Sequence, residues 1–172
     1  MFYPGSIQNG RPAPDFIPFY GVVTDIVPLE GGCRQRVTLL DGNGAVTNFI
    51  VDPGTYFIDH VKLAAGMSVA AFYDASQPAI LIYPPQYQAA VMAQVVPGQT
   101  VTVGRFGRGL QNREGTLRLN IDSNTEVILE NGQSFMGNLE YHTLAVVYGP
   151  STRSIPAQTT PYQVVVLCSR ES

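Results

Sequence analysis

Short apolar runs separated by glycine and proline turns make up most of this chain. From residue 116 to residue 121 every second side chain is apolar, and the others are Thr, Arg and Asn. That two-residue period indicates a strand with one solvated face. The run 68–73 is almost continuously apolar, which is typical of a strand buried on both sides. A short helical turn is suggested at 61–65, and a loop or one helical turn at 131–138, so the pattern predicts an all-β protein with almost no helix.

About five strands are expected in each half of the chain. Glycine and proline turns delimit them, most clearly at Asp41-Gly42-Asn43-Gly44, where Asn-Gly and Asp-Gly pairs favour a hairpin. The expected strands are 19–27, 34–40, 46–51, 68–73 and 89–96, and then 100–106, 116–121, 127–129, 143–148 and 163–168.

The segment 68–88 returns in a weaker form as 143–163. In each copy an apolar run ends at a tyrosine, Tyr73 or Tyr148, and a loop then leads to a Pro-x-Gln motif at 84–86 or 156–158. Upstream, an Asp-x-x-Thr turn occurs at both 52–55 and 122–125. A spacing of about seventy residues is longer than solenoid repeats, so it predicts two small domains.

The repeat suggests domain boundaries and an architecture. We expect an extended or poorly ordered arm over 1–16, a first domain over 17–97 and a second over 98–172. Five short strands with few helices favour a small OB-like barrel in each domain. Two packed sandwiches, or one merged sheet of about ten strands, are the alternatives.

Composition narrows the classes of partner. Charged residues are 13% of the chain and the net charge is −3, so no strong attraction to nucleic acid or to anionic membranes is expected. No stretch approaches the ~18 consecutive apolar residues of a membrane span. No leader peptide is visible. The expected location is extracellular or at the cell surface if a leader has been removed, and cytoplasmic otherwise.

Catalytic and metal-binding patterns are missing from the sequence. His60 and His142 have no ligand-type residue at a metal-binding spacing, and the two cysteines, Cys33 and Cys168, could pair or stay free. The recurring turn carboxylates at 52 and 122 are expected to accept backbone amides rather than to act in catalysis. We therefore predict no enzyme, no catalytic residue, no metal site and no cofactor.

Two surfaces are candidate binding sites. Arg105, Phe106 and Arg108 form a basic and aromatic cluster at a glycine-rich turn, where an exposed Phe could stack a base while arginines hold phosphates. Solvated arginines at a hairpin tip are the plainer interpretation. Tyr83 and Tyr87 flank two prolines and could form a platform for a sugar or peptide, or could cover the end of a barrel.

The motifs Tyr148-Gly149-Pro150 and 154–158, together with 72–74 and 83–87, resemble small repeated β-domains of secreted or cell-surface Firmicutes proteins. The resemblance implies an OB-like barrel and carries no activity. We therefore predict a non-catalytic binding or structural module at the cell surface, with a protein or a cell-wall glycan as partner, and as a monomer or weak homodimer. A single-stranded nucleic-acid-binding OB protein is the alternative.

Overall fold

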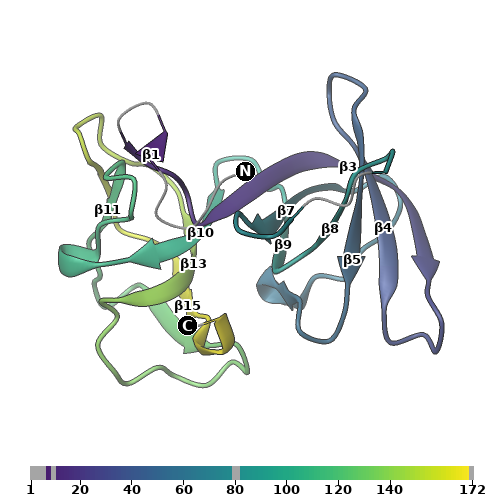
Figure 1. Ribbon diagram of the computed structural model, residues 1–172. Coiled ribbons are helices and arrows are strands. Elements are labelled where there is room, and N and C mark those ends of the chain that lie inside the picture. Colours follow the sequence, from purple (N-terminus) through teal and green to yellow (C-terminus); the bar gives the residue numbers. More distant parts are fainter. Residues whose placement is uncertain (1–6, 9–10, 79–81, 171–172) are drawn as a thin grey trace. The chain divides into compact units, whose positions relative to one another are not determined.

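The structure is a computed structural model that describes residues 7–8, 11–78 and 82–170 (Figure 1). It confirms the all-β class, since the helical elements within these residues are three short 3-10 turns. Contacts divide the chain into two compact units. Unit 1 runs from Phe16 to Val95, and unit 2 runs from Val96 to Ser172 and also takes in Phe2–Asp15. The two units are described separately.

Unit 1 contains seven strands in one sheet, ordered β6-β9-β7-β3-β4-β5-β8. The long strand β3 bends at a register shift between Val23 and Asp25. Because a bulge of this kind increases local twist, it lets one strand pair with different partners along its length. The strands are β3 (Phe16–Pro28), β4 (Gln35–Leu40), β5 (Val46–Val51), β6 (Tyr56–Phe57), β7 (Ser68–Asp74), β8 (Gln86–Gln88) and β9 (Val91–Gln94).

The pairing of unit 1 forms a continuous circuit. β3 pairs antiparallel with β4 and β7, β4 with β5, and β7 with β9, while β5–β8 and β6–β9 are parallel pairs. The turn at Asp52 joins β5 to β6, and two alanines join β8 to β9. Backbone bonds continue across both joints, from Ala89 N to Ile50 O and from Tyr56 N to Ala90 O, each 2.9 Å.

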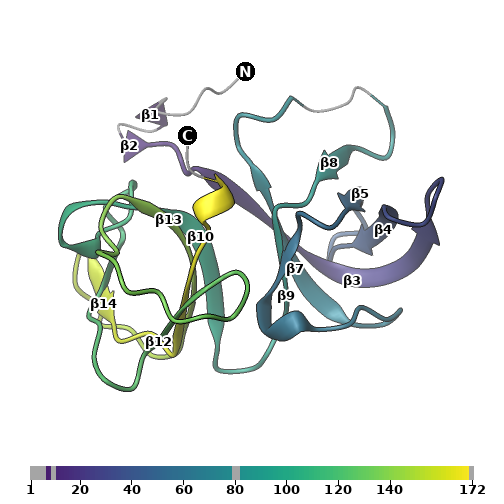
Figure 2. The ribbon, with the colours of Figure 1, turned by 90° about the horizontal axis from the view of Figure 1, so that it is seen from below.

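Unit 2 repeats part of this order of pairing, in a four-stranded sheet, β10-β13-β15-β12, and a separate two-stranded sheet, β11-β14 (Figure 2). β10 pairs antiparallel with β13, β13 with β15, and the parallel pairs are β11–β14 and β12–β15. Where unit 1 has the strand β4, unit 2 has isolated bridges at Gln111 and Asn112. The strands are β10 (Thr100–Phe106), β11 (Leu117–Leu119), β12 (Glu126–Leu129), β13 (His142–Tyr148), β14 (Ala157–Thr159) and β15 (Gln163–Val166).

The two aspartate turns have the expected chemistry. Asp52 Oδ1 accepts the Gly54 amide and Asp122 Oδ1 accepts the Asn124 amide, both at 2.8 Å. The prediction that these carboxylates cap backbone amides is therefore confirmed. The threonine at the end of each turn donates its hydroxyl to a backbone carbonyl of another segment. Thr55 donates to Ala89 O at 2.8 Å, between β8 and β9, and Thr125 donates to Pro161 O at 2.7 Å, between β14 and β15. In both units a hydrogen bond thus links the turn to the joint between the two strands that pair in parallel with its own flanking strands.

Other expectations need correction or fall outside the description. Residues 61–65 are not helical, and a 3-10 turn lies just before them at Ile58–His60. The seven-stranded and four-stranded sheets are separate, which contradicts the alternative of one merged sheet. In the N-terminal arm, residues 1–16, the strand β1 (Ile7–Gln8) pairs with the strand β2 (Arg11–Pro12). The remainder of the expectation for 1–16 falls partly on residues 1–6 and 9–10, outside the described residues.

Each unit has its own apolar core. In unit 1 Phe49 is fully buried, and its ring centroid lies 5.8 Å from that of Phe19 and 6.1 Å from those of Tyr73 and Tyr87. Unit 2 instead packs mainly aliphatic side chains around one buried ring, Phe106. The fully buried side chains of that core are Leu144, Val146, Val164 and Val166, with Leu117 and Leu119 nearly so.

Candidate functional site

The arginine-rich segment of unit 2 is held by two turns. The first follows β10, where Leu110 N donates to Gly107 O at 3.0 Å and Gly107 N donates to Gln111 O at 2.9 Å. Gly109 has a φ of +69°, which favours glycine, and its amide donates to a carboxylate oxygen of Glu140. The backbone that carries Arg108 is therefore fixed from within unit 2.

Asn112 organises the second turn. Its side-chain oxygen accepts the amides of Thr116 at 2.8 Å and Leu117 at 3.0 Å, and its Nδ2 donates to the Thr116 hydroxyl at 2.9 Å. An asparagine that bonds nearby backbone groups in this way stabilises a tight turn. Arg113 lies inside this turn, so its backbone is also held in place.

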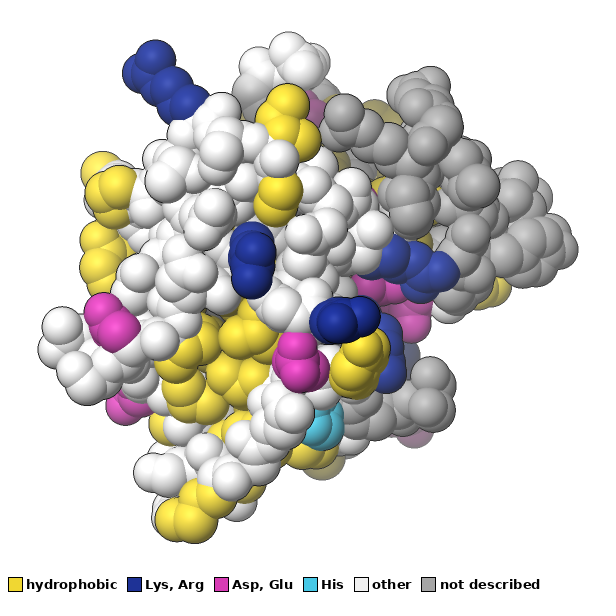
Figure 3. All heavy atoms as spheres, turned by 90° about the vertical axis from the view of Figure 1, so that its left-hand side faces the viewer, with side chains coloured by type: hydrophobic (Ala, Val, Ile, Leu, Met, Phe, Trp, Pro, Cys, Tyr) yellow, Lys and Arg dark blue, Asp and Glu magenta, His cyan; other side chains and the backbone are white. Residues whose placement is uncertain are grey.

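A hollow of about 470 Å³ lies between the two turns. Three arginines and two residues with amide side chains line it, so it is basic. Figure 3 shows this side of unit 2, where dark-blue Lys and Arg side chains gather beside magenta acidic ones. We call this feature the arginine hollow; its lining residues are Arg105, Gly107, Arg108, Gln111, Asn112 and Arg113.

The position of Phe106 corrects one sequence-based expectation. Its side chain is 1% exposed and packs in the core of unit 2, so it cannot stack a base at the surface. The physical reason is strand alternation, which places neighbouring residues of β10 on opposite faces of the sheet. Arg105 and Arg108 do line one hollow, but Phe106 points away from it into the core.

Although Phe106 is buried, the exposed ring of Tyr141 lies close to the hollow. Tyr141 is 55% exposed, and a Cβ added at Gly107 would lie 3.7 Å from its ring. The Tyr141 amide donates to Phe106 O at 2.7 Å, which fixes the backbone beside the first turn. Sequence reasoning missed this residue because it lies far along the chain. Only the pairing of β10 with β13 brings it near the arginines.

The carboxylate of Asp15, from the N-terminal segment, contacts two residues that line the hollow. Asp15 Oδ1 forms an ion pair with Arg113 Nη1 at 2.9 Å, and Asp15 Oδ2 accepts the backbone amide of Arg105, also at 2.9 Å. Glu114 is nearby and half-buried. Burial raises the pKa of its carboxyl above the ordinary value, and the Asp15 carboxylate adds to the rise. No sequence signal pointed to these acids as part of the site.

The two tyrosines predicted as a platform in unit 1 lie in different settings. Tyr83 is 82% exposed, in a loop of which residues 79–81 lie outside the description. Tyr87 is half-buried on β8 and stacks on Tyr73, with ring centroids 3.9 Å apart and planes 19° from parallel. Burial and this contact raise the pKa of Tyr73 to about 12. Tyr87 thus contributes to the core packing of unit 1.

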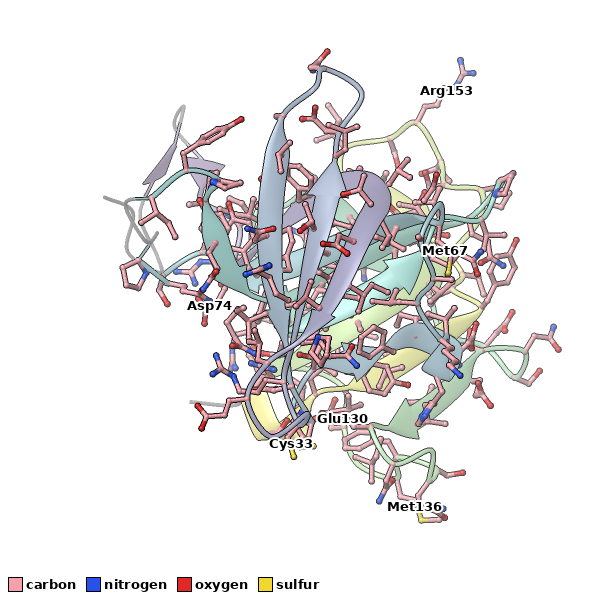
Figure 4. All side chains as sticks on the ribbon, turned by 90° about the vertical axis from the view of Figure 1, so that its right-hand side faces the viewer. Cys33, Met67, Asp74, Glu130, Met136 and Arg153 are labelled. Atoms are coloured by element: carbon pink, nitrogen blue, oxygen red, sulfur yellow. The ribbon has the colours of Figure 1, made fainter. Side chains whose placement is uncertain are left out.

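Both cysteines are exposed free thiols, and Figure 4 labels Cys33 between β3 and β4. Among the described residues, no group of three His, Cys, Asp or Glu side chains is placed to hold a metal ion. Within the same residues, no helix has the length and apolar character needed to cross a membrane.

Comparison with protein-family models, with curated proteins and with solved structures finds no match to this chain. The resemblance to repeated Firmicutes β-domains therefore stays a prediction from short motifs.

Proposed function

We propose that this protein is a non-catalytic binding module made of two OB-type barrels, and that unit 2 binds an acidic glycan in the arginine hollow. The order of pairing supports the barrel assignment. In unit 1 the parallel pair β5–β8 joins the two ends of the strand order, and in unit 2 the parallel pair β11–β14 makes the corresponding contact, with isolated bridges in place of the second strand. Five-stranded Greek-key barrels with such a closing contact bind oligonucleotides and oligosaccharides.

The arginine hollow is the observation that carries the proposal. Arg105, Arg108 and Arg113 line one hollow between two turns that internal hydrogen bonds hold in place. Guanidinium groups bind carboxylates and phosphates in a planar, paired geometry, and a site held in place loses less entropy on binding. The amide side chains of Gln111 and Asn112 add neutral groups of the kind that hydrogen-bond sugar hydroxyls.

Charge distribution favours a local site over a long basic groove. Unit 2, with residues 2–15 and 96–172, carries seven acidic and seven basic side chains, so it has no net charge. Unit 1, residues 16–95, carries six acidic and three basic ones and is net negative. A long polyanion such as nucleic acid would be attracted less by this protein than a short acidic segment that enters the hollow.

Single-stranded nucleic acid is the second candidate, and one observation favours it. The exposed ring of Tyr141 lies beside Gly107 at the border of the hollow, where a base could stack while arginines contact the phosphates. This ring replaces Phe106 in the role that the sequence suggested.

Titration of the full chain with three polymers separates these functions. We expect polygalacturonate, which carries carboxylates, to bind more tightly than uncharged dextran and than oligothymidylate, with affinity that falls as salt rises. The double variant Arg105→Ala plus Arg108→Ala should lose roughly tenfold or more in affinity for polygalacturonate. Arg34→Ala plus Arg153→Ala is the matched control, because it removes the same charge at exposed positions outside the hollow.

Two results would contradict the proposal. Equal losses in the two double variants would show a diffuse charge effect and no specific site. Tighter binding of oligothymidylate, lost on Tyr141→Ala, would favour the nucleic-acid function instead.

A further inference from the structure

Asp15 already places a carboxylate against two donors at the border of the arginine hollow. One carboxylate oxygen lies 2.9 Å from Arg113 Nη1, and the other accepts the Arg105 amide at 2.9 Å. The Asp15 side chain is only 15% exposed. The Arg113 guanidinium and the Arg105 amide therefore already bind one carboxylate, and the bond from the guanidinium is charge-assisted.

The contact links parts of the chain that are far apart in sequence. Asp15 lies 98 residues from Arg113 and 90 residues from Arg105, and both partners also line the hollow. The carboxylate therefore reaches the site from outside its two turns. Those turns are held by hydrogen bonds of their own that do not involve Asp15.

We infer that Asp15 is an internal competitor for the arginine hollow: an acidic ligand must displace its carboxylate from Arg113 before the Arg113 guanidinium can bind that ligand. This inference rests on the proposed function. A site whose competent form is only partly populated binds with an affinity reduced by that fraction. Removal of the Asp15 charge should therefore raise the affinity, even though it removes an ion pair.

The variant Asp15→Asn tests this directly, because its side-chain oxygen can still accept the Arg105 amide while the charge facing Arg113 is lost. In calorimetric titrations with polygalacturonate, Asp15→Asn should bind about threefold to tenfold more tightly than wild type. Asp122→Asn is the matched control, since it removes a carboxylate that also accepts a backbone amide in unit 2. It should leave the affinity unchanged.

A second variant assigns the effect to one partner. In the double variant Asp15→Asn plus Arg113→Ala, the gain should disappear, because the released guanidinium is missing. A gain that persists without Arg113 would overturn the inference.

An experiment on the unaltered chain avoids dependence on folding of the variants. During titration of labelled wild type with polygalacturonate, the NMR signal of the Arg105 amide should shift as its bond to Asp15 breaks. The Asn124 amide, which binds Asp122, should stay in place. An unmoved Arg105 signal at saturation would overturn the inference.

The outcomes distinguish this inference from the proposed function. If wild type binds polygalacturonate but Asp15→Asn binds equally or more weakly while folded, the inference fails and the proposed function stands. If neither protein binds polygalacturonate, the proposed function itself fails and the inference falls with it.

Discussion

Units 1 and 2 share part of their order of strand pairing, but different side chains fill the corresponding positions. The parallel pair Phe49–Tyr87 of unit 1 has its counterpart in Leu119–Thr159 of unit 2. Unit 1 packs two tilted rings there, with centroids 6.1 Å apart, whereas Thr159 is buried and donates its hydroxyl to Pro150 O at 2.8 Å. The same backbone circuit thus accepts an aromatic cluster or a small polar side chain.

The second strand differs most, and that difference forms the hollow that we propose as a binding site. Unit 1 has the six-residue strand β4, paired along its whole length with β5. Unit 2 has only bridges at Gln111 and Asn112, so the chain before and after them forms turns. Those turns carry Arg108 and Arg113. A scaffold that keeps its other pairings can therefore replace a strand with turns without losing its core.

The largest expected effect tests the contrast between the two cores. Phe49→Ala removes a fully buried ring with three aromatic neighbours and should lower the free energy of unfolding by about 3–5 kcal/mol. Leu119→Ala, at the corresponding position of unit 2, should cost about 2–5 kcal/mol. Urea unfolding of both variants measures this. A loss under 1 kcal/mol for Phe49→Ala would contradict the aromatic core of unit 1.

The next effect tests what the units share. Asp52→Ala and Asp122→Ala each remove an acceptor for a turn amide and should each cost about 0.5–2 kcal/mol. Thermal unfolding should show similar losses for the two variants, and Asn at either position should recover most of the stability. Polygalacturonate affinity should not change. Loss of binding without loss of stability would assign one of these carboxylates a functional role.

A smaller effect is a pH dependence of the free energy of unfolding that arises from Tyr73 of unit 1. Because the pKa of Tyr73 is raised in the folded state to about 12 from 10.0, the un-ionised form is favoured by folding. Stability should therefore fall as pH rises from about 10 to about 12, by roughly 1 kcal/mol after allowance for partial exposure. Tyr73→Phe should remove this loss, and Tyr148→Phe in unit 2 should leave it. Chemical unfolding at alkaline pH measures both.

The smallest effect belongs to unit 2. Burial raises the pKa of Glu114 in the folded state, so wild-type stability should fall as pH rises through that pKa. Glu114→Gln should lack this fall and be more stable at pH 7 by roughly a few tenths of a kcal/mol. The exposed Glu30→Gln of unit 1 is the control. A larger effect from the control would contradict the assigned burial of Glu114.

Sequence alone determined what depends on neighbouring residues. Two-residue alternation and apolar runs indicated the longer strands of both units but not β8 or β14, and Asp-x-x-Thr indicated the two capped turns. These predictions succeed because alternation and turn bonds act over a few residues. The glycines at 107 and 109 also placed Arg108 at a turn, and the expected strand 100–106 contains Arg105.

Tertiary structure decided what depends on residues that are distant in sequence. Alternation in β10 implies that Arg105 and Phe106 face opposite ways, but only the packed core settles that Phe106 is the buried one. Tyr141 reaches the arginines through the β10–β13 pairing, and Asp15 through a contact across ninety residues. No local pattern predicts such contacts, because the register and the connections between strands fix which distant side chains share a surface.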